Sequence, residues 1–236
     1  MAESPDDPGL IAEQIDYYRA RAGEYEEWYL RQGRYDHGPE WNGVFLAELE
    51  EVHQALRRFG PGCQVLELAS GTGWWTGTLA RTGAVTAVDA SAETLAHNRR
   101  RHGEAGVRYV QANLFEWSPD RLYDAGFFWL LAVLRPAPPF RGVLGPGQVG
   151  APPGGQVFFI DTLARDIQTL AAGNHHRQDQ EVGVTVRCLN DGRSYRIIKV
   201  FYQPEELSRR LRELGWRVEV RETRHYFLYG SGSRAE

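Results

Sequence analysis

Short apolar runs alternate with helical patterns from Cys63 onward, and this alternation restricts the fold more than any other feature. Strand-like runs cover 63–68, 84–90, 107–114 and 123–131, with helix-like patterns at 74–82 and 91–101. Strands that alternate with helices form parallel sheets with crossover helices. Further strands are predicted at 156–161, 216–223 and 226–232, and a helix at 204–215. We therefore expect an α/β protein with a mostly parallel sheet.

The residues before this alternation predict two helices. Asp7 followed by Pro8 is a typical helix start, and apolar or aromatic residues then recur at helical spacing: Ile11, Ile15, Tyr18, Ala22, Tyr25 and Tyr29. This pattern predicts one continuous amphipathic helix. A second helix is predicted through Phe45, Leu49, Val52 and Leu56, ending at Gly60-Pro61-Gly62. Its acidic residues Glu48, Glu50 and Glu51 are expected on or beside the solvent side.

A glycine-containing loop lies between the first strand and the helix that follows it. The loop reads Glu67-Leu68-Ala69-Ser70-Gly71-Thr72-Gly73. Glycines at 71 and 73 would let the backbone approach a ligand closely and turn sharply into the helix. A pair of glycines is weak evidence taken alone, because such pairs in loops are mostly turns.

Polar residues at the ends of the next two strands strengthen the interpretation. Asp89 ends the second strand, where a carboxylate can accept hydrogen bonds from both hydroxyls of a ribose. Its alternative role is a helix cap, but Ser91 competes for that position. Asn113 and Leu114 end the third strand, where an amide oxygen and an apolar side chain could meet an adenine. Together these positions predict a nucleotide-type cofactor site.

The composition favours a single domain that acts on small molecules. With 236 residues, 42% of them apolar, the chain can bury a core without disulfides or metal. The net charge of −4 gives no general attraction to nucleic acid, and no apolar run approaches the roughly 18 residues of a membrane helix. We expect a cytoplasmic monomer or homodimer, with no nucleic-acid or membrane partner. Cys63 and Cys188 are interpreted as small core residues, because their spacing supports neither a disulfide framework nor a zinc site.

Several segments resemble class I S-adenosylmethionine (SAM)-dependent methyltransferases. They are ELASGTG from Glu67, VTAVDAS from Val85, QANLFEW from Gln111 and YDAGFFW from Tyr123. More narrowly, YYRARAGEYE and DGRSYRIIKVFYQPEEL resemble small bacterial O-methyltransferases that include a phosphonate O-methyltransferase of antibiotic biosynthesis. The resemblance implies a Rossmann-like, seven-stranded, mostly parallel sheet with N-terminal helices and a β-hairpin lid inserted after the fifth strand. It also implies SAM as the cofactor. The single domain would comprise a helical cap (1–60), a cofactor-binding core (61–183), the hairpin lid (184–202) and a closing helix and strands (203–236).

The resemblance assigns roles to the motif residues. Glu67 would order the glycine loop or the amino-acid end of the cofactor, and Asp89 would hold the ribose. Tyr18, Arg21 and Tyr25 would close over the cofactor, although core packing of the aromatic stripe is the alternative. Asn113 replaces a commoner aspartate but keeps an acceptor oxygen. The expected cofactor-binding set is Tyr18, Arg21, Tyr25, Glu67, Ala69, Ser70, Gly71, Gly73, Asp89, Ala90, Asn113 and Leu114.

A hairpin is predicted where the acceptor would bind. Two strand-like runs, 184–189 and 194–202, flank Asn190-Asp191-Gly192, the strongest hairpin signal in the chain. The hairpin would project over the carboxyl edge of the sheet, where open α/β sheets bind ligands. It carries the cations Arg187, Arg193, Arg196 and Lys199, the only lysine in the chain. We interpret them as an anion clamp, with an outward-facing, solvated hairpin as the alternative.

The members of this clamp depend on the strand register. By alternation, Lys199 shares a face with Tyr195, whereas Arg196 points the other way. The register decides which of the two lies on the face of Arg187, and the resemblance favours Lys199. The expected acceptor-binding set is Tyr29, Arg187, Arg196 and Lys199. No metal site is expected. The pair His175-His176 could supply a base or a metal ligand, but adjacent histidines in a polar loop are more often solvent-facing, and a catalytic role is equally disfavoured for His37.

The reaction favoured by these observations is O-methylation of a small metabolite, with an anionic carboxylate or phosphonate among the candidates. Methyl transfer from a sulfonium is an in-line displacement that depends mainly on positioning, so no catalytic residue is assigned. N-methylation and C-methylation stay open. A nicotinamide oxidoreductase is disfavoured, because Trp74-Trp75 follows Gly73 without the third glycine of that motif.

One stretch does not fit this fold. The crossover helix expected after the fourth strand falls on a segment rich in proline and glycine, about 135–153. The histidine of an HVP motif, implied by the resemblance, is also missing from Leu131–Arg135. We hypothesise a local frameshift. Plausible codons for 140–152, read one base later, encode FEAFWGRVRSAL, in which apolar residues recur at helical spacing. The alternative to an active enzyme is therefore a protein that binds SAM but is catalytically impaired.

Resequencing the coding DNA tests the frameshift. We expect an insertion or deletion that restores the helical sequence. An unambiguous reading that encodes the present residues, with intact in-frame relatives that share them, would rule the error out.

Overall fold

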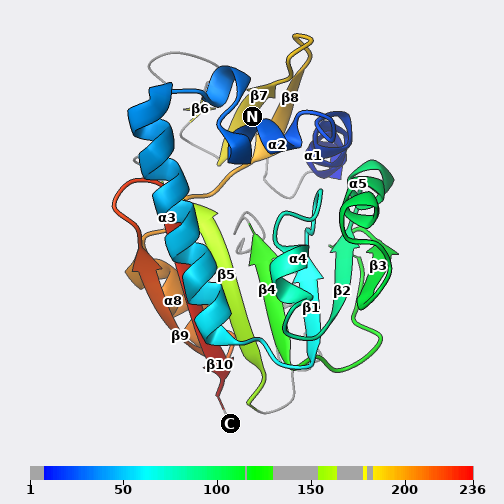
Figure 1. The fold of residues 1–236 in the computed structure, drawn as a ribbon, viewed down its shortest axis with the longest axis vertical. Helices are drawn as coiled ribbons and strands as arrows, with labels where there is room; N and C mark the ends of the chain where they lie inside the picture. The colour runs from blue at the N-terminus through cyan, green and yellow to red at the C-terminus, as the bar shows by residue number, and fades with distance from the viewer. Residues whose placement is uncertain (1–7, 115, 130–153, 164–177, 180–182, 236) are drawn as a thin grey trace.

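The computed structural model describes residues 8–114, 116–129, 154–163, 178–179 and 183–235. They form one seven-stranded and one three-stranded sheet with flanking helices (Figure 1). The helices are α1 (Pro8–Ala20), α2 (Tyr25–Leu30), the 3-10 helix η1 (Gly33–Tyr35), α3 (Gly38–Phe59), α4 (Thr76–Leu79), α5 (Ala92–His102) and α8 (Pro204–Glu213). The strands are β1 (Gln64–Leu68), β2 (Ala84–Asp89), β3 (Val107–Gln111), β4 (Ala125–Trp129), β5 (Gln156–Thr162), β6 (Gln178–Asp179), β7 (Val184–Cys188), β8 (Ser194–Ile198), β9 (Trp216–Glu222) and β10 (Phe227–Arg234).

The large sheet confirms the predicted α/β fold. Its strand order is β3-β2-β1-β4-β5-β10-β9, and its first five members are parallel. β10 runs antiparallel to both β5 and β9. Because the order reverses between β1 and β4, the carboxyl ends of the parallel strands form the edge at which a ligand is expected. The segment of the frameshift hypothesis and the missing HVP motif lie outside the described residues.

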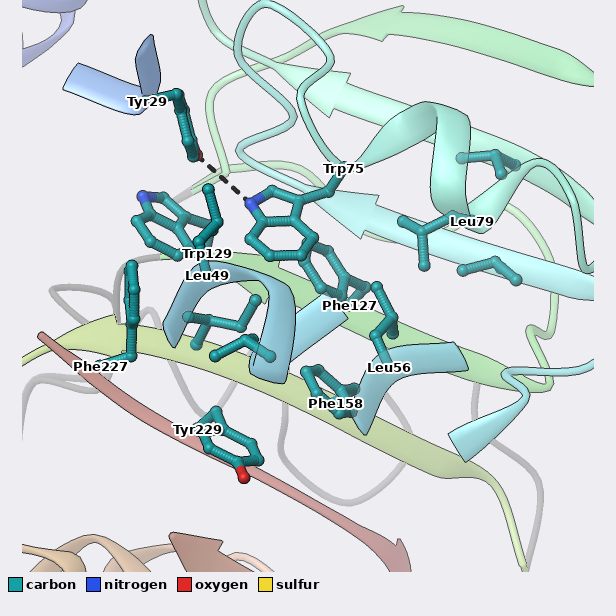
Figure 2. Close-up of a cluster of buried hydrophobic side chains, with 14 of the residues drawn as sticks. Tyr29, Leu49, Leu56, Trp75, Leu79, Phe127, Trp129, Phe158, Phe227 and Tyr229 are labelled. Carbon is teal, nitrogen blue, oxygen red and sulfur yellow. Dashed lines mark hydrogen bonds between the residues drawn. The ribbon is translucent and has the colours of Figure 1, made fainter. Parts of the chain in front are cut away.

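Helices cover both faces of the large sheet, so its central strands are apolar on both sides. Along β5, Val157 and Phe159 pack in a cluster with α8, whereas Phe158 and Ile160 pack in a second cluster with α3. Figure 2 shows this second cluster, which Tyr29 joins from α2. Tyr29 thereby anchors the N-terminal segment to the core. Among the described helices, none has the length and apolar character needed to span a membrane.

The prediction of one continuous N-terminal helix is wrong. The chain leaves helical geometry between Ala20 and Tyr25, and Gly23, a poor helix former, lies in the break. The break separates two tyrosines that pack in different places. Tyr17 contacts the hairpin through Leu189 and Ile197, whereas Tyr29 lies in the core under α3.

The small sheet contains the predicted hairpin. It has the order β6-β7-β8, and β8 forms an edge that α1 covers. The carboxylate of Glu13 accepts from the amide of Arg196 at 2.6 Å, and the side chain of Gln14 accepts from the amide of Ile198 at 2.8 Å. These bonds satisfy backbone groups that an open edge would leave exposed. In Figure 1, α1, α2 and the hairpin lie together beyond the carboxyl ends of β4 and β5.

Two residues are placed differently from the sequence-based expectation. Glu48 is buried, whereas Glu50 and Glu51 on the same helix are exposed as expected. The Glu48 carboxylate accepts from the amides of His225 at 3.0 Å and Tyr226 at 2.9 Å, and from the hydroxyl of Thr223. It therefore fixes the β9–β10 connection to α3. Cys63 is exposed rather than in the core, because it precedes the buried part of β1.

We predict that Glu48→Ala destabilises the fold by about 2–4 kcal/mol, because it leaves buried donors without an acceptor. Glu50→Ala, on the exposed side of the same helix, is the control and should change stability by less than about 0.5 kcal/mol. Urea unfolding measures both. Equal effects would show that the Glu48 contacts do not stabilise the β9–β10 connection.

Candidate active site

The glycine loop leaves β1 in a conformation that few residues adopt. Ala69, Gly71 and Gly73 have φ values of +53°, +54° and +86°, which L side chains rarely occupy. A Cβ on Gly73 would lie 2.4 Å from Oδ1 of Asn98, so this position has no room for a side chain. A Cβ on Gly71 would lie 3.4 Å from the ring of Tyr25, which shows that α2 lies directly over the loop.

Asp89 connects the glycine loop to the end of β2. Its Oδ2 accepts from the amide of Gly71 at 2.8 Å, and its Oδ1 accepts from the amide of Ser91 at 2.9 Å and the hydroxyl of Thr94 at 3.1 Å. Burial raises the pKa of Asp89, although these hydrogen bonds oppose the rise. The expectation that Ser91 caps the next helix is confirmed, because its hydroxyl accepts from the amide of Thr94 at 3.1 Å. Asp89 is therefore not required as the cap.

Glu67 is almost fully buried below the loop. Its Oε2 accepts from the hydroxyl of Thr76 at 2.6 Å, and Thr76 in turn accepts from Nδ2 of Asn98 at 2.9 Å. Burial raises the pKa of Glu67 to about 8, against the opposing hydrogen bond from Thr76. These hydrogen bonds join β1, α4 and α5 on either side of the glycine loop, which supports the predicted role of Glu67 in ordering that loop.

Two hydroxyls of the loop suit a polar ligand. Ser70 Oγ and Thr72 Oγ1 are buried, and neither has a hydrogen-bond partner among the described residues. Buried polar atoms without partners are uncommon in folded proteins. The amino-acid end of SAM carries donors and acceptors that could satisfy such hydroxyls, so the loop fits this cofactor.

The other predicted cofactor residues lie along the same edge. Asn113 and Leu114 follow β3, and Ala90 follows β2, its neighbour in the sheet. The side chain of Gln111 donates to the carbonyl of Ala90 at 3.4 Å, and the amide of Ala112 donates to the carbonyl of Asp89 at 2.9 Å. The ends of β1, β2 and β3 thus place the predicted ribose and adenine residues side by side.

Aromatic residues and one arginine close this edge from the N-terminal side. The guanidinium of Arg21 lies 5.1 Å from the ring centroid of Tyr25, and its Nη2 donates to the hydroxyl of Tyr35 at 3.2 Å. Tyr18 packs edge-on against Tyr17, with centroids 5.0 Å apart. Burial raises the pKa of Tyr18 to about 12, and the charges of Arg187 and Asp161 both act on its phenol. Tyr18 therefore lies between the cofactor side and the hairpin.

The observed register resolves which hairpin cations share a face. Arg187 pairs with Tyr195, so Arg187, Tyr195 and the alternating position Lys199 lie on one side of the hairpin. Arg196 pairs with Val186 on the other side, where its guanidinium forms an ion pair with Glu13 at 2.8 Å. Arg193 forms an exposed ion pair with Asp191 in the turn. Arg187 and Lys199 are thus brought together, and Arg196 is not.

The remaining predicted acceptor residue, Tyr29, lies in the core. Its ring stacks on Trp74 at a centroid distance of 4.2 Å. Its hydroxyl accepts from Nε1 of Trp75 at 3.3 Å (Figure 2). Burial raises the pKa of Tyr29 well above its ordinary value. His37 is half-buried, and His175 and His176 lie outside the described residues.

Three residues of the site were not among those predicted from the sequence. Asp161 in β5 forms a buried ion pair with Lys199. Thr76 and Asn98 complete the network of Glu67. A carboxylate near the end of the otherwise apolar strand QVFFID was the available signal for Asp161, because an isolated buried charge needs a partner.

The hairpin turn is attached to the N-terminal segment by a group of contacts that we call the tip clasp (Glu24, Glu27, Arg34 and Asn190). The carboxylates of Glu24 and Glu27 accept from the backbone amide and side-chain amide of Asn190, at 3.0 and 2.8 Å. Arg34 forms an ion pair with Glu24 at 3.3 Å and also donates to the side chain of Asn190. The clasp holds the hairpin against the helices that cover the glycine loop.

Comparisons with known proteins identify the family of the chain. A family described as a methyltransferase domain matches residues 65–144. The structure of a DhpI-SAH complex is 36% identical, covers 96% of this chain and 98% of its own, and superposes with a TM-score of 0.74. A DhpI-SAM-HEP complex is 38% identical over the same shares, with a TM-score of 0.73. A SAM-dependent methyltransferase from Clostridium acetobutylicum is 14% identical over 93% of this chain and 100% of its own (TM-score 0.63), which supports the fold alone. A comparison with curated proteins gave no match.

The chain therefore belongs to the class I SAM-dependent methyltransferases. Within that class it is related to DhpI, a protein that forms complexes with SAH and with SAM and HEP. SAM is its cofactor, as the resemblance predicted.

The pKa of Glu67 leads to a stability prediction. The folded protein holds this proton up to about pH 8, whereas the unfolded chain releases it near 4.5. The folded state thus binds more protons between these values, and its free energy of unfolding should fall as pH rises through them, by on the order of 5 kcal/mol from this group. Glu67→Gln should flatten this part of the curve.

Urea unfolding without ligand, at intervals from pH 5 to 9, checks this expectation. Glu40→Gln, which changes an exposed carboxyl, is the control and should follow the wild type. Parallel curves for wild type and Glu67→Gln would contradict the raised pKa.

Proposed function

We propose that the chain transfers the methyl group of SAM to an oxygen of a small anionic metabolite, a carboxylate or a phosphonate. The observation that carries this proposal is the register of the hairpin. It brings Arg187 and Lys199 to one face, next to Asp161 of β5 and close to the residues that cover the glycine loop. Two cations at this position suit an anionic acceptor.

Arg187 also lies near the residues predicted to hold the cofactor. Its guanidinium interacts electrostatically with Arg21, Tyr17, Tyr18 and Tyr35. Arg21 in turn stacks on Tyr25, which covers Gly71. Methyl transfer requires acceptor and cofactor side by side, and this sequence of contacts supports the assignment of Arg187 to the acceptor.

The chemistry needs positioning more than proton transfer. SAM supplies a methyl group bound to a sulfonium, which is a good leaving group. A carboxylate or phosphonate oxygen is already charged, so it needs no general base, only alignment with the methyl group in a site shielded from water. Arg187 and Lys199 would orient the anion, and Tyr18 and Tyr25 would exclude water. Tyr18 is a neutral phenol at physiological pH, and burial, which raises its pKa to about 12, keeps it neutral at alkaline pH as well.

The relationship to DhpI favours an active enzyme over a SAM-binding remnant. The match covers 96% of this chain at 36–38% identity, so it extends beyond the cofactor loop to the hairpin and the C-terminal strands. A remnant that only binds SAM would not need a hairpin whose cations converge on one face.

Methyl transfer to a panel of acceptors tests the proposal. Labelled SAM is offered with carboxylates, phosphonates, alcohols and amines. We expect transfer to an anionic acceptor, and a decrease of about 100-fold in kcat/KM for that acceptor in Arg187→Gln, equivalent to about 2.7 kcal/mol. The affinity for S-adenosylhomocysteine, on the order of micromolar by calorimetry, should stay within about threefold.

Arg193→Gln is the control, because it removes an exposed guanidinium from the same hairpin. It should change neither quantity by more than about threefold, and NAD should give no calorimetric signal. Transfer only to neutral alcohols or amines, with no effect of Arg187→Gln, would overturn the proposal.

A further inference from the structure

Lys199 and Asp161 form a buried ion pair between the two sheets. Lys199 follows β8 of the small sheet, and Asp161 lies in β5 of the large sheet. The ammonium donates to Oδ1 of Asp161, and the two side chains are only 4% and 3% exposed. The backbone amide of Lys199 also donates to the carbonyl of Gly183 at 2.7 Å. The pair is therefore held at a fixed place between the hairpin and the core.

The residue type at position 199 is informative. Lys199 is the only lysine in the chain, which otherwise uses arginine for every such cation. A guanidinium stays charged when buried, whereas an ammonium can lose its proton there. A buried lysine in this chain thus needs a neighbouring carboxylate to remain a cation, and Asp161 supplies it.

The groups that face Lys199 act in opposite directions. Burial lowers the pKa of Lys199, and the positive charge of Arg187 on β7 lowers it further, whereas Asp161 on β5 raises it. The ring of Phe201 lies 5.0 Å from the ammonium. From α1, Tyr18 interacts with both Arg187 and Asp161, and its own pKa is raised to about 12. Asp161 is the group that keeps the ammonium charged.

Stability alone gives little reason for this arrangement. The cost of removing two charges from water often equals or exceeds their mutual attraction, so a buried ion pair is weak evidence for a stabilising role. The pair lies on the same hairpin face as Arg187, at the carboxyl side of β5 where an open α/β sheet binds its ligand.

We propose that Asp161 is a positioning residue of the acceptor site, which holds the ammonium of Lys199 in place and keeps it charged so that it binds the acceptor anion together with Arg187. Asp161 does not contact the transferred methyl group in this role. The inference rests on the proposed function for its link to the acceptor, but the state of Lys199 can be measured without any acceptor.

The single lysine makes that measurement direct. Lysine labelled with ¹³C at Cε gives one side-chain NMR signal, and its titration reports the pKa of Lys199. In Asp161→Asn, we expect the midpoint to fall by about one pH unit or more, because the opposing carboxylate is lost. Asp161→Glu should retain most of the wild-type value. Asp191→Asn, in the exposed hairpin turn, is the control and should leave the midpoint unchanged.

Anion binding and turnover test whether Lys199, held by Asp161, binds the acceptor. Methylphosphonate and acetate serve as probes, and each should shift the lysine signal of the wild type. In Asp161→Asn, acceptor KM should rise about tenfold or more at alkaline pH and less at neutral pH, with SAH affinity within about threefold. The double variant with Lys199→Arg should lose this alkaline dependence, because a guanidinium stays charged.

The outcomes separate the two claims. An unchanged lysine midpoint in Asp161→Asn, or a loss of activity equal at every pH, would overturn the positioning role. If the midpoint falls as expected but neither probe shifts the lysine signal and no anion is methylated, the proposed function fails while the charge-keeping role of Asp161 stands. If Asp161→Asn does not fold, Asp161→Glu and Lys199→Arg decide, since the proposal requires that both bind the probes.

Discussion

The hydrogen bond from the amide of Gly71 to the carboxylate of Asp89 fixes the geometry on which the site depends. It joins the loop after β1 to the end of β2, at 2.8 Å, and so sets the distance between the two strand ends at which the cofactor is predicted to bind. The positive φ values of Ala69, Gly71 and Gly73 turn the loop into this position. Glu67, Thr76 and Asn98 support it from below. A carboxylate that holds the protein's own backbone in this way is already oriented, so the ordering cost of binding would be reduced if Asp89 holds the ribose as proposed.

Local patterns predicted the sheet, the glycine loop and the hairpin, because each depends on neighbours in the sequence. Contacts between distant residues could not be predicted in the same way. Strand alternation places the side chains of Lys199 and Arg196 on opposite faces of the hairpin. Only the observed pairing of Arg187 with Tyr195 shows that Lys199 is the one on the face of Arg187. Glu48 looked like a solvent-facing residue because its three partners lie 175 to 178 residues later. The break before Tyr25 likewise depends on what Tyr17 and Tyr29 contact.

The N-terminal segment contacts both the glycine loop and the hairpin. Tyr25 lies over Gly71 on the cofactor side, and Glu24, its neighbour in sequence, accepts from Asn190 in the hairpin turn. The two residues are adjacent, so a displacement that uncovers the glycine loop also strains the tip clasp. If the cofactor binds beneath Tyr25 and the acceptor binds beside the hairpin, as we propose, the exchange of one is mechanically linked to the exchange of the other.

The burial of the only lysine also determines the chemistry of the protein surface. Every exposed cationic side chain of the Lys/Arg type is a guanidinium, and the one ε-amino group is enclosed with Asp161. Reagents and metabolites that acylate or form imines with amines would find no lysine side chain on the outside of the closed protein. Amine acylation at a side chain would thus require the hairpin to separate from the core, which makes the rate of such a modification a measure of how often Lys199 becomes exposed.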